Sequence, residues 1–249
     1  MITAIDSASR ESYDDWHARH PVDVEADAPW HRMIRAELDP VRDLAGKRVL
    51  DIGCGRGGFA TWLAKRQAAP REVVGCDFSP VAVGMAERFA AASGVRNTRW
   101  EVADIQRLEQ FADGEFDTVF SCETIEHVPD PPLAVRQLAR VLKPGGRLFL
   151  TTPNYFSTIG LYRAYCWVRG KPFDEGGQPI CQVNMAFQTR RWATQAGLRV
   201  VRTAGSGQYL PFPGRPPIRL GFMEHPHFVM KWLGLHSLIV AVKPTPKDG

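Results

Sequence analysis

The sequence predicts an α/β fold, in which helices pack on both faces of a largely parallel sheet. The first observation is that short apolar runs alternate with helical patterns between residues 47 and 150, as in βαβ units with right-handed crossovers. The second is that 249 residues with 44% hydrophobic and 23% charged side chains fit one globular domain with additions. This composition excludes a mostly disordered chain, a collagen-like fibre and a small disulfide scaffold.

Five apolar runs are the predicted strands of this central segment, and three helical patterns connect them. The predicted strands are 48–52, 72–76, 98–102, 118–121 and 147–151, and the predicted helices are 58–66, 80–93 and 131–142. Residues 142–146, Leu-Lys-Pro-Gly-Gly, are expected to form a turn before the last of these strands. The reason is that Pro144 cannot continue a helix and that glycines favour the turn that ends one.

The flanking segments are less regular and rich in aromatic residues. Residues 10–44 have the pattern of one or two helices, anchored by Trp16, Trp30 and Ile34. A helix over 189–196 and strands over 198–203 and 237–242 are predicted near the other end. Residues 153–185 and 205–235 read as irregular stretches. Long loops inside a compact domain are usually functional, and their aromatic content argues against disorder.

The charge is unevenly distributed along the chain, although the net charge is only +4. Residues 151–249 carry 12 basic and four acidic side chains, a net of +8. Without a long basic stripe, this excess favours a local anion site over a nucleic-acid surface. The five cysteines form no Cys-x-x-Cys pair, and no window reaches the about 20 apolar residues of a membrane span. A cytoplasmic protein is therefore expected, while the oligomeric state stays open.

A glycine-rich loop follows the first predicted strand and opens the next helix. Gly53, Gly55 and Gly57 let the backbone approach a ligand closely, and the helix start offers free amides. Asp77 ends the second strand, where an acidic side chain can accept the hydroxyl protons of a ribose. Asp51 stands two residues before the first glycine, where it would repel a pyrophosphate but attract a cation. The pattern predicts a nucleoside cofactor with positive charge, such as S-adenosylmethionine.

Five motifs, in this order, resemble those of the class I S-adenosylmethionine-dependent methyltransferases. They are 51–57 (Asp-Ile-Gly-Cys-Gly-Arg-Gly), 73–80 (Val-Val-Gly-Cys-Asp-Phe-Ser-Pro), 102–105 (Val-Ala-Asp-Ile), 116–123 (Phe-Asp-Thr-Val-Phe-Ser-Cys-Glu) and 142–146. The resemblance covers about residues 45–205 and the final strand. It implies a Rossmann-like sheet of seven strands with an antiparallel last strand. The string at 122–130 resembles the ubiquinone-biosynthesis O-methyltransferase branch most closely.

This resemblance implies a division of the chain and a cofactor site. We expect one domain over 1–249, with an N-terminal helical lid (1–45), a cofactor-binding core (46–152) and substrate-cap insertions (153–185 and 205–235). By resemblance, Asp51 and the glycine loop hold the methionine moiety, Asp77 binds the ribose, and Phe78 and Asp104 flank the adenine. The expected cofactor set is Asp51, Gly53, Cys54, Gly55, Gly57, Asp77, Phe78, Ala103, Asp104, Ile105 and Cys122. The lid edge is expected at Tyr13, Trp16, His17 and His20.

The Glu-x-x-Glu-His string after the fourth strand is the candidate catalytic segment. His127, with Glu126 beside it, is the expected catalytic contact, because an imidazole can take a proton from a hydroxyl at neutral pH. Glu123, Glu126 and His127 would also share one face of a helical turn, where they could ligate a divalent metal. Additional ligands for that metal would come from Gln178, Asn184, His225 or His227. A third interpretation is that Glu126 and His127 only orient the loop.

The expected reaction is O-methylation of a small, partly apolar hydroxylated metabolite. C- or N-methylation of a similar molecule is the main alternative, RNA 2′-O-methylation is a weaker one, and a non-catalytic cofactor-binding subunit is the last. The aromatic caps would enclose the acceptor and exclude water. Several cations in the caps could bind an anionic group on it: Arg163, Arg169, Lys171, Arg215 and Arg219.

Overall fold

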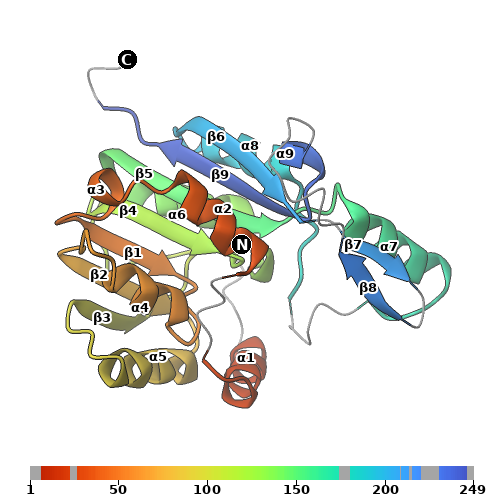
Figure 1. Ribbon diagram of the computed structural model, residues 1–249, viewed down its shortest axis with the longest axis horizontal. Helices are drawn as coiled ribbons and strands as arrows, with labels where there is room; N and C mark the ends of the chain where they lie inside the picture. The colour runs from red at the N-terminus through yellow and green to blue at the C-terminus, as the bar shows by residue number, and fades with distance from the viewer. Residues whose placement is uncertain are drawn as a thin grey trace.

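A central sheet organises the molecule, which we describe from a computed structural model. The structure describes residues 7–22, 27–173, 180–207, 209–212, 215–219 and 230–245. Within these residues, seven strands form the central sheet: β1 (Arg48–Ile52), β2 (Glu72–Asp77), β3 (Thr98–Val102), β4 (Phe116–Cys122), β5 (Leu142–Pro153), β6 (Arg199–Ser206) and β9 (His236–Val242). Their order is β3-β2-β1-β4-β5-β9-β6 (Figure 1).

The direction of the last strand confirms the fold class predicted from the sequence. The strands from β3 to β5 pair in parallel, as in β1 with β2 and with β4. β9 enters between β5 and β6 and runs antiparallel to both. The sheet is therefore mostly parallel with an antiparallel final strand.

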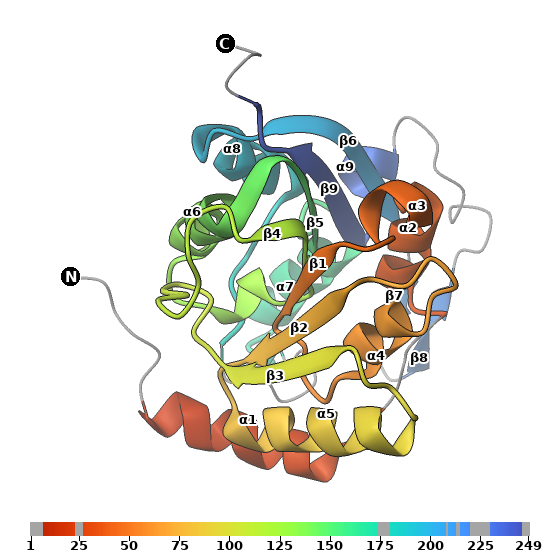
Figure 2. The same ribbon diagram turned by 90° about the vertical axis from the view of Figure 1, so that its left-hand side faces the viewer.

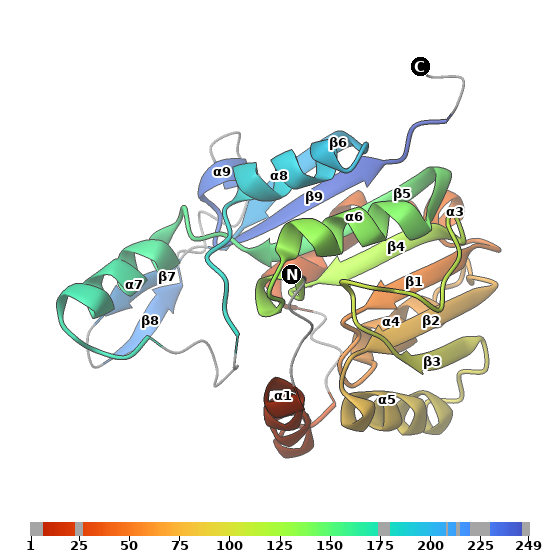
Figure 3. The same cartoon turned by 180° about the vertical axis from the view of Figure 1, so that it is seen from behind.

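Helices cover both faces of this sheet because its strands are apolar on both sides. Leu50 and Ile52 point into a core shared with α6 (Pro131–Val141) and α8 (Ala186–Gln195). Val49 and its neighbours on the other face pack against α2 (Pro29–Glu37) and α4 (Gly58–Ala64). Figure 3 shows α6 and α8 together on their face of the sheet.

Two further helices lie at the β3 edge, over the carboxyl ends of the first strands. α5 (Pro80–Ala92) connects β2 to β3, and its N-cap Ser79 accepts a hydrogen bond from the Ala82 amide at 3.1 Å. α1 (Ser7–Arg19) packs beside α5 (Figure 2). The Ser79 hydroxyl donates to the Asp14 carboxylate, so the cap of α5 also fixes α1.

The N-terminal region contains three helices in its described part, not the one or two that the sequence predicts. Proline explains the division, because it begins both α2, at Pro29, and α3 (Pro40–Asp43). Asp39 caps α3 by accepting from the amides of Val41 and Arg42, each at 3.1 Å. Proline at the first helical position is favoured there and cannot continue a preceding helix.

Three other local predictions are wrong in their details. The segment 142–146 begins β5 and is not a separate turn, since Leu142 pairs with Phe116 before the register shifts. Residues 153–185 contain a helix, α7 (Thr158–Val168), where an irregular stretch is predicted. Residues 205–235 contain the hairpin β7 (Tyr209–Phe212) and β8 (Arg215–Arg219), and the short helix α9 (Met230–Leu233). Among the described helices, none has both the length and the apolar character needed to cross a membrane.

Candidate functional site

A cavity of about 510 Å³ opens at the carboxyl ends of β1, β2 and β4. In a parallel α/β sheet this edge is where ligands bind, because the strand order reverses there. Its walls include Asp51 from β1, Asp77 from β2 and His127 from the segment after β4. α1 supplies Tyr13 and His17 to the opposite wall. The cavity therefore brings together most of the residues that the sequence singles out.

The glycine loop forms one wall of the cavity, and two of its glycines, Gly53 and Gly57, have no room for a side chain. Gly53, Gly55 and Gly57 have φ values of +74°, +51° and +83°, which L residues rarely adopt. A Cβ atom on Gly53 would lie 2.2 Å from the Thr124 Oγ1 atom. One on Gly57 would lie 2.6 Å from the Cβ of Ala86. Gly57 itself is packed beneath the loop and does not line the cavity, whereas Gly53 and Gly55 do.

Asp51 is a buried carboxylate that faces the cavity with one oxygen unsatisfied. Its Oδ2 atom is inaccessible to solvent and has no hydrogen-bond partner within the described residues. Burial, and then the charge of Asp77, raise the pKa of Asp51 to about 7. A buried carboxylate without a partner is unfavourable, so a cationic ligand would satisfy it.

Asp77 is fixed by the backbone around it. Its Oδ2 atom accepts from the Gly55 amide at 2.9 Å, and its Oδ1 atom accepts from the Ser79 amide at 3.0 Å. Burial nevertheless raises the pKa of Asp77 to about 6, against the effect of these hydrogen bonds. Each carboxylate oxygen has a second lone pair, so the group can still accept from two neighbouring hydroxyls.

The expected adenine side is apolar. Phe78, Ala103 and Ile105 line the cavity there, and Cys54 and Cys122 line it elsewhere. Asp104 does not line the cavity. Its Oδ1 atom accepts from the Gln106 amide at 2.8 Å, so the carboxylate stabilises the turn after β3. The structure therefore corrects the prediction that Asp104 flanks the ligand directly.

These features fit S-adenosylmethionine. The unsatisfied Asp51 oxygen suits an ammonium group, the fixed Asp77 carboxylate suits a pair of ribose hydroxyls, and the Phe78 side suits an apolar heterocycle. Gly53 and Gly55 line the cavity with backbone alone, which is expected where a ligand approaches the backbone closely. When bound, this cofactor supplies an electrophilic methyl group.

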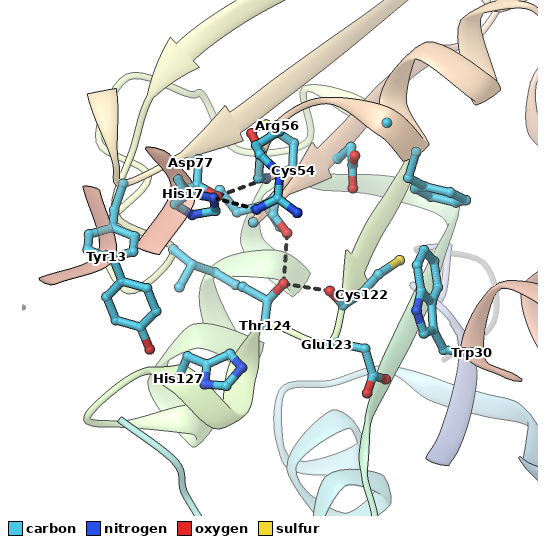
Figure 4. Close-up of a pocket in the computed structure, with 18 of the residues that line it drawn as sticks. Tyr13, His17, Trp30, Cys54, Arg56, Asp77, Cys122, Glu123, Thr124 and His127 are labelled. Carbon is cyan, nitrogen blue, oxygen red and sulfur yellow. Dashed lines mark hydrogen bonds between the residues drawn. The ribbon is translucent and has the colours of Figure 1, made fainter. Parts of the chain in front are cut away.

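His127 lies at the far side of the cavity and its ring is fixed by one hydrogen bond. Its Nδ1 atom donates to the carbonyl of Ile180 at 2.7 Å, because a carbonyl can only accept. The Nε2 atom lies 3.7 Å from the Oε1 atom of Glu126. The Tyr13 hydroxyl donates to the same Ile180 carbonyl at 3.4 Å, and burial raises the pKa of Tyr13 above its ordinary value. Tyr13 and His127 are therefore neighbours (Figure 4).

Glu126 is buried behind the cavity wall. Its Oε2 atom accepts from the Thr152 hydroxyl at 3.1 Å, and its backbone carbonyl accepts from the Gln182 amide at 2.7 Å. It does not line the cavity. Contrary to the expectation of direct catalytic contact, Glu126 does not face the cavity, and its carboxylate lies beside His127.

Glu123 departs from the predicted helical turn. Its φ is +50°, a strained value for a residue that is not glycine, and the helical turn, a 3₁₀ helix, begins only at Ile125. The carboxylate turns toward β9, where its Oε2 atom lies 2.8 Å from the Nδ1 atom of His236. Its Oε1 atom is buried and has no hydrogen-bond partner within the described residues.

The metal site predicted from Glu123, Glu126 and His127 is not formed. The prediction assumed one helical face, whereas the backbone at Glu123 directs that carboxylate elsewhere. No group of three His, Cys, Asp or Glu side chains is arranged as a metal site in the described parts of the chain. Asn184 donates to the Thr152 hydroxyl at 3.4 Å, so this amide belongs to the buried network. The other candidate ligands lie outside the described residues: Gln178, His225 and His227.

α1 contacts the glycine loop through Arg56. The Nη1 atom of Arg56 donates to the Nδ1 atom of His17 at 3.3 Å, and its guanidinium lies 5.1 Å from the ring centre of Trp16. Burial, and then the Arg56 charge, lower the pKa of His17 to about 4, so this imidazole is neutral at physiological pH. His20 is exposed and bonds to the Trp16 carbonyl, so it does not belong to the cavity wall.

Several cavity residues escape the sequence-based prediction, and three of them have polar or aromatic side chains of interest: Arg56, Trp30 and His236. Arg56 lies inside the glycine motif, where any residue type fits the pattern. Trp30 is far from the motifs in sequence and reads as a core anchor. His236 lies 113 positions after Glu123, and only the pairing of β9 with β5 brings the two together. None of the three has a local sequence signal that marks it as part of a site.

Comparisons with known proteins agree with this geometry. A family model described as a methyltransferase domain matches residues 50–150. A ubiquinone biosynthesis O-methyltransferase from Dechloromonas aromatica is 38% identical over 174 residues, which cover 68% of this chain and 71% of that protein. A protein of the same name from Xanthomonas oryzae pv. oryzae is 40% identical over 129 residues. That match covers 51% of this chain and 52% of the relative, so the chain spans about half the length of such relatives.

Solved structures share the fold. A methyltransferase in a complex with the Haloferax volcanii Trm112 activator superposes with a TM-score of 0.65 at 24% identity, covering 95% of this chain and 98% of the other. An S-adenosylmethionine-dependent methyltransferase from Mesorhizobium loti superposes with a TM-score of 0.61 at 20% identity, covering 88% of this chain and 100% of the other. At such identities the likeness concerns the fold alone.

Proposed function

Since the chain belongs to the class I S-adenosylmethionine-dependent methyltransferases, in the branch of the ubiquinone-biosynthesis O-methyltransferases, we propose that it methylates a hydroxyl oxygen of a small, partly apolar metabolite. One observation carries this proposal. A single cavity is lined both by Asp51, a buried carboxylate with an unsatisfied oxygen, and by His127, whose imidazole is oriented by a hydrogen bond. Such an arrangement suits transfer of a methyl group to an acceptor that loses a proton.

In this proposal the protein acts mainly by alignment and by accepting one proton. The Ile180 carbonyl holds the proton of the imidazole on Nδ1, so the lone pair of neutral His127 is on Nε2. That atom takes the acceptor's hydroxyl proton as the oxygen is methylated. The Glu126 carboxylate, 3.7 Å away, stabilises the imidazolium that results. Tyr13 and the rest of α1 exclude water from the cavity.

The test of this function is the identity of the bond that forms. The protein is incubated with S-adenosylmethionine carrying a ¹³C methyl group and with acceptors that offer a phenol, an aromatic amine or an activated carbon. We expect a methyl ether as the product, which ¹³C NMR distinguishes from an N-methyl or C-methyl group. If only the amine or only the carbon acceptor is methylated, the protein is an N-methyltransferase or a C-methyltransferase, and the proposal of O-methylation is wrong.

The affinity for the cofactor is expected to depend on pH through Asp51. A cationic ligand prefers the ionised carboxylate, whose pKa in the free protein is about 7. As the pH falls below that value, binding must release a proton, so affinity decreases by up to about tenfold per pH unit. Calorimetric titration with S-adenosylhomocysteine, between about pH 5.5 and 7.5, measures this slope.

The Asp51→Asn variant is the matched control for this titration, because it keeps the size of the side chain and removes its charge. We expect weaker binding, with a dependence on pH that is much flatter above pH 6, where the Asp77 carboxylate is ionised. A slope that is the same in the variant and the wild type would mean that Asp51 is not the group that titrates.

The Glu123–His236 pair is proposed to hold the acceptor. Both side chains line the cavity and are about one-fifth exposed, at 20% and 19%. The buried Oε1 atom of Glu123 needs a hydrogen-bond donor, which a hydroxyl of the acceptor can supply. Glu123→Gln should raise the KM for a dihydroxylated phenol by about 10-fold or more, because hydrogen bonds to charged groups contribute about 1.5–3 kcal/mol.

For this variant, KM, kcat and the affinity for the cofactor are measured separately and compared with the wild-type values. We expect the calorimetric affinity for S-adenosylhomocysteine to be unchanged, since Asp51 and Asp77 are untouched. Glu109→Gln is the matched control, because that carboxylate is 77% exposed and remote from the cavity. Equal KM values for Glu123→Gln and Glu109→Gln would show that the Glu123–His236 pair does not bind the acceptor.

A further inference from the structure

The buried tyrosine of α1, Tyr13, contacts two functional parts of the cavity at once. Its ring packs edge-on against Phe78, with 4.9 Å between the ring centres. Its hydroxyl donates at 3.4 Å to the Ile180 carbonyl, which also accepts from the Nδ1 atom of His127 at 2.7 Å. In Figure 4 the phenol end of Tyr13 points toward His127. Tyr13 therefore joins the expected adenine side to the group that orients the imidazole.

Three further contacts fix α1 against the loops that follow β1 and β2. The Ser79 hydroxyl, at the start of α5, donates to the carboxylate of Asp14. Arg56 of the glycine loop donates to His17 at 3.3 Å and lies over the ring of Trp16. Both loops line the cavity at the proposed cofactor site. A ligand that holds these loops in place therefore also holds α1 in place.

The Ile180 carbonyl depends on its hydrogen-bond donors for its direction, because residues 180–185 form neither helix nor strand. The Gln182 amide anchors this segment by donating to the Glu126 carbonyl at 2.7 Å, but that bond lies one peptide group further along. A carbonyl oxygen has two lone pairs, so it can accept from a phenol and an imidazole together. Each of these donors restrains the carbonyl for the other.

The direction of this carbonyl decides which nitrogen of His127 carries the proton. A carbonyl opposite Nδ1 keeps the proton there, so the lone pair of the neutral ring is on Nε2. The Glu126 carboxylate acts in the opposite sense, because it lies 3.7 Å from Nε2 and attracts a proton to that atom. If the carbonyl turns away, the tautomer with its proton on Nε2 gains, and this tautomer has no lone pair to offer an acceptor hydroxyl.

We propose that Tyr13 is a positioning residue, which transmits the docking of α1 on a cofactor-loaded site to His127 through the Ile180 carbonyl. The imidazole then presents its lone pair on Nε2 when the methyl donor is in place. The choice of tautomer does not depend on methyl transfer, whereas its value for catalysis rests on the function proposed above. Direct contact between the Tyr13 hydroxyl and a ligand is a different role, and it would leave the tautomer unchanged.

The test is the ¹⁵N NMR spectrum of the histidine side chains at neutral pH, with and without S-adenosylhomocysteine. Couplings between the ring nitrogens and the carbon-bound protons show which nitrogen is protonated, and the signal missing from His127→Ala identifies the residue. We expect the ligand to lower the ratio of the Nε2-protonated to the Nδ1-protonated tautomer in the wild type. Tyr13→Phe, which keeps the ring, should raise this ratio by about 3- to 10-fold in the presence of ligand, as the loss of one neutral hydrogen bond implies.

Turnover gives a second readout, which must agree with the first. In Tyr13→Phe, kcat should fall in proportion to the Nδ1-protonated fraction, by no more than about 10-fold. KM for the acceptor should stay near the wild-type value, since Glu123 and His236 are unchanged. Asp14→Ala removes the partner of the Ser79 hydroxyl and loosens α1, so it should shift the tautomer ratio in the same direction with Tyr13 intact.

Each of these two variants has a matched control. Tyr162→Phe removes a hydroxyl from a tyrosine of α7 that is 38% exposed and does not line the cavity. Asp15→Ala removes the neighbouring aspartate, which is exposed and pairs with Arg19 of the same helix at 3.3 Å. Both controls should keep the wild-type tautomer ratio and kcat.

The positioning role and the proposed function fail in different ways. The positioning role is overturned if Tyr13→Phe keeps the wild-type tautomer ratio, or if the ligand does not change that ratio in the wild type. In the first case a loss of turnover in His127→Ala would still support the proposed function. A shifted ratio in Tyr13→Phe, in a protein that methylates no hydroxyl, would support the positioning role and contradict the proposed function.

Discussion

Replacing His127 with alanine should lower kcat by about 10²–10⁴-fold, the range ordinarily contributed by a positioned general base. The acceptor's proton would then have to leave to water in a cavity that α1 covers. Cofactor affinity should stay near the wild-type value, because His127 lies apart from the Asp77 carboxylate in the cavity (Figure 4). The measurement is single-turnover methyl transfer at saturating cofactor and acceptor, together with calorimetric binding of S-adenosylhomocysteine.

His20→Ala is the matched control for this variant. His20 is an exposed histidine just after α1, and its ring bonds to the backbone carbonyl of Trp16 in that helix. We expect its kcat to equal that of the wild type. If His127→Ala also retains full turnover, the imidazole has no part in proton transfer and the role proposed for it is wrong.

Replacing Gly53 with alanine should abolish measurable cofactor binding. The added Cβ atom would lie 2.2 Å from Thr124 Oγ1 and 2.8 Å from Thr124 Cβ, so the loop or the segment after β4 must move. Gly53 lines the cavity, so that movement displaces the backbone that the ligand contacts. The positive φ adds about 1–2 kcal/mol of strain for any L residue. Calorimetric titration with S-adenosylhomocysteine measures the loss.

Gly46→Ala separates backbone strain from steric contact. Gly46 has a φ of +67°, close to that of Gly53, but an added Cβ atom would meet nothing within 4 Å. Gly53→Ala should lose more stability than Gly46→Ala in thermal unfolding, because only it adds a steric clash to the backbone strain, and only Gly53→Ala should lose cofactor binding. Wild-type affinity in Gly53→Ala would show that the glycine loop does not form the ligand site.

The features that follow from local sequence are the ones that sequence predicts well. The strand β1, the glycine loop and Asp77 are specified within about 30 residues of chain, and the structure places them at one cavity as expected. The alternation of strands with helices along the chain likewise predicts the parallel part of the sheet, because each βαβ unit is a local structure. The position of β9 between β5 and β6 is not local, and only the resemblance implied an antiparallel last strand.

The failures of prediction also have physical causes. The sequence predicts an irregular stretch in place of α7, because the helix exposes apolar residues to solvent and so lacks the pattern of an amphipathic helix. The metal set assumed that Glu123 begins a helical turn, whereas its left-handed backbone conformation directs the carboxylate to His236. Asp104 matches its motif but bonds to the backbone of the following turn. Sequence spacing does not determine where such side chains point.

Methyl transfer by the purified chain tests the central claim most directly. The protein is incubated with S-adenosylmethionine carrying a labelled methyl group and with a panel of small phenols, and both products are quantified. We predict a labelled methyl ether and an equal amount of S-adenosylhomocysteine, with both lost in Gly53→Ala. A chain that binds S-adenosylhomocysteine but transfers no label to any hydroxylated acceptor would contradict the claim that it is an O-methyltransferase of small metabolites.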